Sequence, residues 1–266
     1  MTVKPEGTPI WADATFPDIE AAKSFYGDVL GWTFGESSPE YGNYTQAFSD
    51  GKAVAAVVPP MPGQEAASQW CLYLATTDAA AAAGRIRDNG GQVAMEPMQI
   101  GDFGSMCIAS DPGGVVFGVW QPGTHAGFEA PVEQPGAYCW AEIFTRTPEK
   151  SDTFFPAVFP FTSQQMEDAQ MDFRLYNTTE GTALGRMKMT DDFPPEVPPF
   201  INVYFNVANC DEAVATATKL GAVVRYGPMD SPFGRFAGLG DPQGAHFSVI
   251  DTTTTEGGPP TTTDIS

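Results

Sequence analysis

The sequence predicts an α+β fold of four βαβββ modules, arranged as two similar units in tandem. The 266-residue chain repeats its landmarks at an offset of about 130 residues, and each half alternates helical and strand-like apolar spacing in the same order. A segment rich in proline and glycine separates the halves. We therefore expect units at 1–120 and 137–250, a linker at 121–136 and a disordered, low-complexity tail at 251–266.

The repeat is visible in short motifs that keep their order along the chain. Residues 11–13 (Trp-Ala-Asp) align with residues 140–142 (Trp-Ala-Glu). Residues 111–114 (Asp-Pro-Gly-Gly) align with residues 241–244 (Asp-Pro-Gln-Gly). Coincidences in one register over the whole length are not expected by chance, so the two halves should share one fold.

The first module begins with a strand at 10–16, which a helix follows. Asp18 suits the N-cap, apolar residues recur at helical spacing, and Gly31 ends the helix. Two runs of residues with high β propensity, at 44–48 and 53–58, complete this module.

The second module repeats this order of elements. A strand at 70–75 precedes an alanine-rich helix at 79–88, which Asn89 and the two glycines after it end. A hairpin at 104–109 and 115–120 then forms around the Asp-Pro-Gly-Gly turn.

The second unit carries the same signals. Thr147 and Pro148 suit a helix start, because proline favours the first helical position. The other elements that we expect after the strand around Trp140 are strands at 173–176, 183–189, 200–207, 234–239 and 245–250, and a helix at 212–220.

The composition excludes several classes of function. There are 33 acidic residues against 13 Lys and Arg, for a formal net charge of −20. Nucleic acids and anionic membranes need clustered cations, so neither is an expected partner. A 42% share of hydrophobic residues is enough for a substantial core.

The chain ends and the cysteines indicate the compartment. The N-terminus has no long apolar region typical of a signal peptide, and no run of 18 apolar residues could span a bilayer. The four cysteines lie in or beside apolar runs, which favours reduced, buried thiols over disulfides. We expect a cytoplasmic protein.

The helix motif at 17–32, which reads Pro-Asp-Ile-Glu-Ala-Ala-Lys-Ser-Phe-Tyr-Gly-Asp-Val-Leu-Gly-Trp, resembles a signature of the vicinal oxygen chelate superfamily. Gly90-Gly91 and the two Asp-Pro-x-Gly turns support the resemblance, which covers about residues 8–250. This superfamily includes glyoxalase I, bleomycin-resistance proteins and extradiol dioxygenases. The layout is most similar to a two-unit, hydroxylase-like actinobacterial branch that includes proteins found with antibiotic biosynthesis. The resemblance implies two glyoxalase-like units of curved sheets, each enclosing a cavity.

The resemblance also locates the family's metal ligands. Metal-dependent members place His or Gln in the first strand, His at the start of the fifth and Glu near the end of the last. The corresponding residues here are Trp11 and Trp140, the segments 69–71 and 201–203, and Gly118 and Ser248. These residues make a poor ligand set, so we expect no metal centre and no cofactor. The alternative is a metal held in a new arrangement by Asp13, Glu142 and His246.

Alternation along the strands indicates what lines the cavities. If Trp11 faces the cavity then so does Asp13, and Trp140 and Glu142 repeat the pair. We expect His125, in the linker, to be solvated. The ligand-binding residues that we predict are Trp11, Asp13, Tyr44, Phe48, Trp120, Trp140, Glu142, Tyr176, His246 and Ser248.

An aromatic cavity that contains a carboxylate suits a planar or cationic ligand, through stacking and cation–π contacts. The preferred hypothesis is metal-independent binding of a small aromatic or cationic natural product, for antibiotic resistance, sequestration or delivery, by a monomer or homodimer. An alternative is a metal-free glyoxalase-like lyase or hydroxylase-like enzyme of secondary metabolism or aldehyde detoxification, with Asp13, Glu142 or His246 as general base. A third is a non-catalytic interaction protein whose cavities have collapsed.

Overall fold

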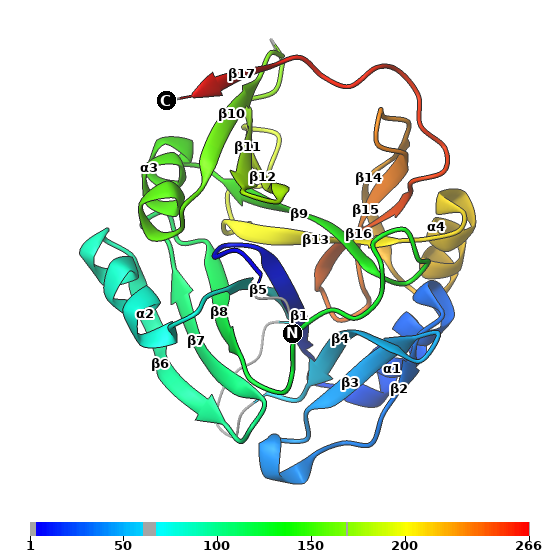
Figure 1. The fold of residues 1–266 in the computed structure, drawn as a ribbon. Helices are drawn as coiled ribbons and strands as arrows, with labels where there is room; N and C mark the ends of the chain where they lie inside the picture. Colours follow the sequence, from blue (N-terminus) through cyan, green and yellow to red (C-terminus); the bar gives the residue numbers. More distant parts are fainter. Residues whose placement is uncertain (1–3, 61–67, 169, 266) are drawn as a thin grey trace.

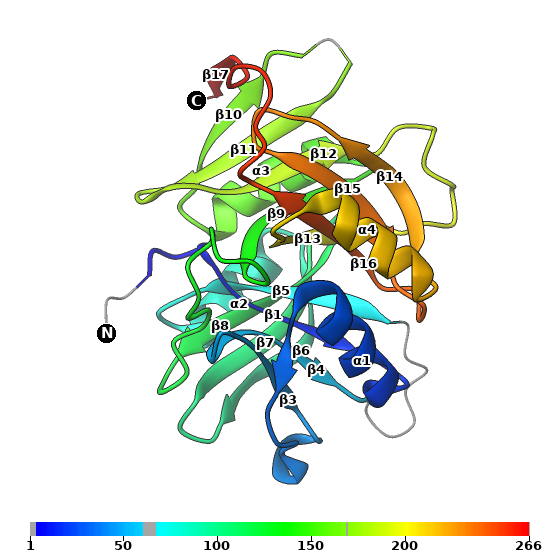
Figure 2. The same ribbon diagram turned by 90° about the vertical axis from the view of Figure 1, so that its right-hand side faces the viewer.

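The computed structural model describes residues 4–60, 68–168 and 170–265. These residues form two large curled sheets and four α-helices, so the α+β fold predicted from the sequence is confirmed (Figure 1). Each sheet comes from one half of the chain, and the two sheets lie back to back (Figure 2).

The first half of the chain forms a sheet of eight strands. Its central strand, β1, pairs in parallel with β4 and antiparallel with β5. Along the sheet the strand order is β2-β3-β4-β1-β5-β8-β7-β6. The elements are β1 (Pro9–Thr15), α1 (Ile19–Leu30), β2 (Thr33–Phe34), the 3₁₀ turn η1 (Pro39–Tyr41), β3 (Thr45–Ser49), β4 (Lys52–Val58), β5 (Gln69–Ala75), α2 (Ala79–Asp88), β6 (Gln92–Ile100), β7 (Gly104–Ser110) and β8 (Val116–Pro122).

The second half repeats this arrangement with one more strand. Its sheet has the order β14-β15-β16-β13-β9-β12-β11-β10-β17, with β9 in the place of β1. The elements are β9 (Tyr138–Thr145), α3 (Pro148–Val158), β10 (Thr162–Met166), β11 (Phe173–Thr178), β12 (Gly181–Lys188), β13 (Phe200–Asn206), α4 (Cys210–Lys219), β14 (Val223–Met229), β15 (Arg235–Gly240), β16 (His246–Asp251) and β17 (Thr262–Ile265).

Local capping explains where the helices begin and end. The Asp18 carboxylate accepts a 2.9 Å hydrogen bond from the backbone N–H of Ala21, and Gly31 ends α1 in the left-handed conformation, with a φ of 72°. The Asn209 side chain caps α4 in the same way, so this helix begins two residues earlier than the sequence predicted.

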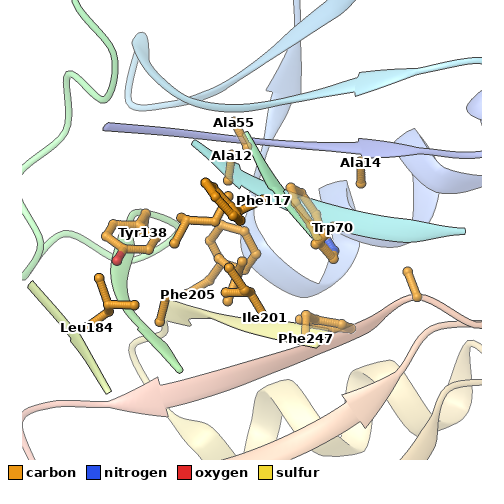
Figure 3. Packing of buried hydrophobic residues seen from close by; sticks show 14 of the residues in the cluster. Ala12, Ala14, Ala55, Trp70, Phe117, Tyr138, Leu184, Ile201, Phe205 and Phe247 are labelled. Carbon is orange, nitrogen blue, oxygen red and sulfur yellow. The ribbon is translucent and has the colours of Figure 1, made fainter. Parts of the chain in front are cut away.

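One hydrophobic core joins the two halves. Alternate residues of β1, Ala12 and Ala14, point toward the second sheet, where Phe205 and Phe247 meet them together with Trp70 of the first sheet (Figure 3). The apolar sides of all four helices belong to the same core, with α1 against α4 and α2 against α3. The side of each sheet that faces the other half is therefore fully used for packing.

Hydrogen bonds also cross between the halves at the two Asp-Pro-x-Gly turns. The Tyr26 hydroxyl of α1 donates to Asp241 Oδ2 at 2.8 Å, and the Ser151 hydroxyl of α3 donates to Asp111 Oδ2 at 2.6 Å. Each turn thus binds a helix of the other half.

The C-terminal segment differs from the predicted disordered tail. Residues Thr262–Ile265 form β17, which pairs antiparallel with the edge strand β10. The physical reason is that β10 presents an unpaired backbone edge, and β-branched threonines suit the strand that covers it.

Two further expectations concern membranes and thiols. Among the residues that the structure describes, no helix is both long and apolar enough to cross a membrane. The thiols of the four cysteines are free; Cys107 and Cys210 are buried as expected, whereas Cys71 and Cys139 are half-buried.

Candidate functional site: two concave faces

Each curled sheet has a concave face, which lies on the side away from the shared core (Figure 1). In β1, Trp11 and Asp13 alternate with the core residues Ala12 and Ala14, so both point to this face. In β9, Trp140 and Glu142 alternate with Ala141 and Ile143 in the same way. We call these surfaces the first and the second concave face.

The pairing register is the same behind both faces. Trp11 pairs with Tyr73 and Asp13 with Cys71 across β1 and β5. Trp140 pairs with Tyr204 and Glu142 with Asn202 across β9 and β13. In both sheets the register slips immediately before the tryptophan. This slip turns the indole and the carboxyl group to the concave side.

The first concave face gathers aromatic side chains around Asp13. The cluster contains Trp11, Tyr73 and Trp120, which are all buried, with Tyr44 and Phe48 packed against them. The structure thus brings together all five residues that the sequence predicted for this unit, which are Trp11, Asp13, Tyr44, Phe48 and Trp120.

A short hydrogen-bonded chain reaches Asp13 on the first face. The indole N–H of Trp11 donates to the Tyr44 hydroxyl at 2.6 Å, and that hydroxyl donates to Asp13 Oδ2 at 3.3 Å. Burial raises the pKa of Asp13 to about 7, although hydrogen bonds from Tyr73 and Tyr44 act in the opposite direction. Asp13 is therefore a carboxyl group that changes its protonation near neutral pH.

On the second face, the carboxyl group of Glu142 has a donor at each oxygen. Trp140 donates its indole N–H to Oε1 at 3.1 Å, and Tyr204 donates its hydroxyl to Oε2 at 2.8 Å. Burial raises the pKa of Glu142, and the hydrogen bonds from Tyr204 and Trp140 oppose this rise.

The polar chain continues beyond Tyr204 on the second face. The hydroxyls of Tyr204 and Tyr226 lie 3.3 Å apart, and the Tyr226 hydroxyl lies 2.8 Å from Ser248 Oγ. Asn202 donates from its side-chain amide to Ser248 Oγ at 2.8 Å and to the Tyr226 hydroxyl at 3.1 Å. The predicted residues Trp140, Glu142 and Ser248 thus belong to one connected network.

The residues predicted from the sequence did not include Tyr73, Tyr204 or Tyr226, which the structure places at the two faces. Glycines in neighbouring strands make room for two of these rings. A Cβ at Gly118 would collide with the ring of Tyr73, and a Cβ at Gly238 would collide with the ring of Tyr226. A glycine opposite a tyrosine was therefore the available signal.

Tyr176 corrects one prediction, because it lies in the shared core and not on the second concave face. Its hydroxyl donates to Asp152 Oδ1 at 2.8 Å, and its ring stacks on Phe161. In β11 alternation places Tyr176 and Phe173 on opposite sides of the sheet, and it is Phe173 that lies beside Gly185 and Glu142.

His125 was expected to be solvated, and that prediction was wrong. Its ring meets the Trp11 ring edge-on at a centroid distance of 4.4 Å, and Trp120 donates its indole N–H to the His125 carbonyl at 3.0 Å. Nε2 of His125 is buried without a hydrogen-bond partner, and burial lowers the pKa of this imidazole. The linker therefore forms part of the first concave face.

His246 lies at the start of β16, and its ring packs against Phe200 at a centroid distance of 5.3 Å. Burial and the nearby Arg225 lower the pKa of His246. The imidazole is uncharged at neutral pH, and the hydrogen-bonded chain that starts at Glu142 runs to Ser248 without it.

The divalent metal that the resemblance implies does not fit the residues at the expected positions. The indole N–H groups of Trp11 and Trp140 are donors to protein oxygens, and Gly118 has no side chain. Asp13 and Glu142 lie on different sheets, so the alternative metal site with His246 is not formed. Within residues 4–60, 68–168 and 170–265, no three His, Cys, Asp or Glu side chains group as a metal site would need.

The arrangement favours two kinds of chemistry. No Lys, Arg or His among the described residues forms an ion pair with Asp13 or Glu142, so a bound cation could supply the missing countercharge. A carboxyl group with a pKa of about 7 could also exchange a proton with a bound molecule.

Comparisons of sequence identify relatives over almost the whole chain. The family described as "Glyoxalase/Bleomycin resistance protein/Dioxygenase superfamily" matches residues 11–119. The chain is 36% identical over 251 residues to "Putative glyoxylase CFP32" of Mycobacterium tuberculosis, covering 92% of this chain and 95% of that protein. It is 34% identical over 265 residues to "Anthracycline biosynthesis protein DnrV" of Streptomyces peucetius, covering 94% and 95%.

Comparisons of structure agree with this fold. A Mn(II)-bound glyoxalase from Novosphingobium aromaticivorans is 18% identical, with a TM-score of 0.62 over 95% of this chain and 87% of that chain. The 2,2',3-trihydroxybiphenyl 1,2-dioxygenase of Sphingomonas wittichii is 12% identical, with a TM-score of 0.65 over 96% and 92%. At these identities the likeness concerns the fold alone.

Proposed function

Because the chain belongs to the glyoxalase/bleomycin resistance protein/dioxygenase superfamily, we propose that it binds a small aromatic or cationic natural product on its concave faces without a metal. The binding would serve antibiotic resistance, sequestration or delivery. Nucleic acids and membranes are not proposed as partners, in keeping with the formal net charge of −20. The four free thiols favour a cytoplasmic setting.

The observation that carries this proposal is the environment of Asp13. A partly desolvated carboxyl group without a protein cation stands among Trp11, Tyr44 and Tyr73. Aromatic rings offer stacking and cation–π contacts worth roughly 0.5–2 kcal/mol each. A ligand with a planar ring and an ammonium group would use both features at once.

The name of one relative supports this ligand class, whereas another is named a putative glyoxylase. One relative is named for anthracycline biosynthesis, and anthracyclines are aromatic natural products. The proposal extends that association to the present chain, which is 34% identical to it.

Tryptophan fluorescence provides a direct test, since Trp11, Trp120 and Trp140 lie at the two faces. Titration with planar aromatic amines, including an anthracycline, should quench the emission with a Kd below about 100 μM, or roughly −5.5 kcal/mol. The control is Asp28→Asn, which changes an exposed carboxylate on α1. Absence of binding below that concentration, for charged and uncharged aromatic compounds alike, would contradict the proposal.

A second candidate is a metal-free lyase or related enzyme, and the pKa of Asp13 favours it. A general acid or base works best when its pKa lies near the working pH, and burial raises that of Asp13 to about 7. Turnover of aldehyde–thiol adducts or quinone-like aromatics, lost in Asp13→Asn while aromatic binding persists, would establish this function. Binding without turnover of any such substrate would favour the first proposal.

A further inference from the structure

The two concave faces differ in how the protein satisfies their carboxyl groups. Each oxygen of Glu142 has a donor, at 3.1 Å from Trp140 and 2.8 Å from Tyr204. Asp13 accepts from two phenols: Tyr44 donates to Oδ2 at 3.3 Å, which is close to the limit of a hydrogen bond, and Tyr73 is the second donor. The Tyr44 hydrogen bond to Asp13 is therefore longer than either hydrogen bond to Glu142, so a stronger donor would gain more at Asp13 than at Glu142.

The difference follows from side-chain length. Glu142 is one methylene longer than aspartate, and this reach lets it accept from Trp140 on its own strand. In the first unit the shorter Asp13 leaves the indole of Trp11 to donate to Tyr44 instead.

The neighbouring rings also differ between the units. Tyr44 and Phe173 occupy equivalent positions in the two sheets. Tyr44 directly precedes Thr45, which pairs with Val57, and Phe173 directly precedes Arg174, which pairs with Arg186. The second unit carries its extra hydroxyl on Tyr226, which extends the chain to Ser248.

We infer that the protonated amine of an aromatic ligand binds at Asp13 of the first concave face, and that the second concave face takes no cation. This inference rests on the proposed function and names the ligand group and the unit that binds it. Charge-assisted hydrogen bonds from an ammonium group are short and strong. Both carboxyl groups have only neutral donors, and Asp13 is the one whose Tyr44 hydrogen bond is long.

The groups that face Asp13 add no positive charge. They are Tyr44 beside β3, and Cys71 and Tyr73 on β5. Burial raises the pKa of all three well above their usual values, so they stay uncharged. The nearby His125 has a lowered pKa and is neutral at pH 7. The ligand would meet no competing cation.

Binding of an amine at Asp13 is linked to the loss of a proton from this carboxyl group. An ammonium group binds the ionised carboxylate, whereas Asp13 is partly protonated near pH 7. Binding at pH 6.5 should therefore release a proton, and the affinity should rise about tenfold between pH 6 and pH 8 before it levels off. The carboxyl group of Glu142 should contribute nothing to this linkage.

Calorimetry with a matched pair of probes tests the inference. The charged probe is 1-(aminomethyl)naphthalene, and the uncharged probe of the same shape is 1-naphthalenemethanol. Titrations at pH 6.5 in two buffers with different ionisation enthalpies report the protons released. We expect one amine bound per chain, with proton release. Asp13→Asn should weaken amine binding at least tenfold and alcohol binding less than about twofold, and Glu142→Gln should leave amine binding within about twofold.

Three calorimetric results would overturn the assignment of the amine to Asp13, and a fourth would overturn the proposed function. Loss of amine binding in Glu142→Gln but not in Asp13→Asn would overturn the inference and leave the proposed function standing. Equal losses for amine and alcohol in Asp13→Asn would also overturn it, because Asp13 would then act through shape and not as a counterion. Proton release is measured on the wild-type protein and does not depend on the variant folding, and a value of zero at pH 6.5 would overturn it as well. If neither probe, nor any larger planar amine, binds the wild-type protein, the proposed function itself fails.

Discussion

The first and second concave faces start from the same tryptophan-x-acid triplet in the same strand register, yet their polar groups are arranged differently. In the second unit Glu142, Tyr204, Tyr226 and Ser248 form a continuous chain of hydrogen bonds. In the first unit Asp13 accepts from Tyr73 and, at 3.3 Å, from Tyr44, and burial raises its pKa to about 7. Burial raises the pKa of Glu142 as well. One methylene group and the position of one phenol thus separate the two hydrogen-bond arrangements around these carboxyl groups.

The buried carboxyl group of Asp13 lowers the free energy of unfolding of this protein at neutral pH. Burying an ionisable group without a countercharge lowers stability, and such groups gather at functional sites. A structural role alone would favour the arrangement of the second unit. The contrast can be tested by changes that convert one face toward the other.

The largest expected effect is a gain of stability in Asp13→Asn. A carboxyl group with a raised pKa in the folded state stabilises the fold below its unfolded pKa of about 4, and this contribution is lost as the pH rises through 7. At pH 8 the variant should exceed the wild type by about 2–4 kcal/mol, from a shift of roughly three pH units, and the difference should fade toward pH 4. Urea unfolding at pH 8, 6 and 4 measures it.

Glu142→Gln is the matched change on the second face. Glutamine keeps one acceptor oxygen for two donors, so the lost hydrogen bond offsets any gain from removing the charge. The variant should lie within about 1 kcal/mol of the wild type at pH 8. A gain as large as that of Asp13→Asn would remove the distinction between the faces.

Gly118 and Ser248 occupy equivalent positions in the two units, and the separate variants Gly118→Ser and Ser248→Gly should both lower the free energy of unfolding. Gly118→Ser should lose about 1–3 kcal/mol, because the new Cβ collides with the ring of Tyr73 and displaces it from Asp13. Ser248→Gly should lose about 1 kcal/mol through its hydrogen bonds with Asn202 and Tyr226. Binding of the aromatic amine should fall in the first variant alone, and loss in the second alone would reverse the assignment.

Tyr44→Phe should have a smaller effect, of about 1–2 kcal/mol. It leaves the indole N–H of Trp11 without an acceptor and takes a donor away from Asp13. The pKa of Asp13 should rise further, so the pH profile of amine binding should move to higher pH. Tyr41→Phe, which changes a phenol that packs on the exposed Phe103, serves as the control. An unchanged pH profile in Tyr44→Phe would show that the Tyr44 hydroxyl does not influence Asp13.

His125→Phe should have the smallest effect, neutral or stabilising by up to about 1 kcal/mol. The change removes a buried nitrogen that has no hydrogen-bond partner and keeps an aromatic ring against Trp11. Thermal unfolding at pH 7 measures it. A loss above about 2 kcal/mol would indicate that Nε2 of His125 has a partner in solution.

Much of the fold was predictable from the sequence, because the repeat and the two Asp-Pro-x-Gly turns are local signals. The strands β2, β6, β10 and β14 were missed, and they lie at or next to the edges of the sheets. β6 shows why: most of its residues alternate between exposed and half-buried positions and it contains Pro97, so it lacks a continuous apolar side.

The candidate site was predictable only where strand alternation decides it. Alternation placed Trp11 with Asp13 and Trp140 with Glu142 correctly on the concave faces. To exclude Tyr176 from the site, the register of β11 was also needed, and the sequence does not reveal that register. His125 contacts Trp11, which lies more than a hundred positions earlier in the chain, so no local sequence pattern predicts this contact. Long-range contacts of this kind are set by tertiary packing.

The turns that bind helices of the opposite half have a consequence for dynamics. Opening either half would expose the core residues of the other and break the contacts of Tyr26 with Asp241 and Ser151 with Asp111. The most protected amides of both halves should therefore exchange with deuterium through one common opening event. A molecule bound at Asp13 would slow that exchange across the distant second sheet as much as in its own, without any change of conformation there.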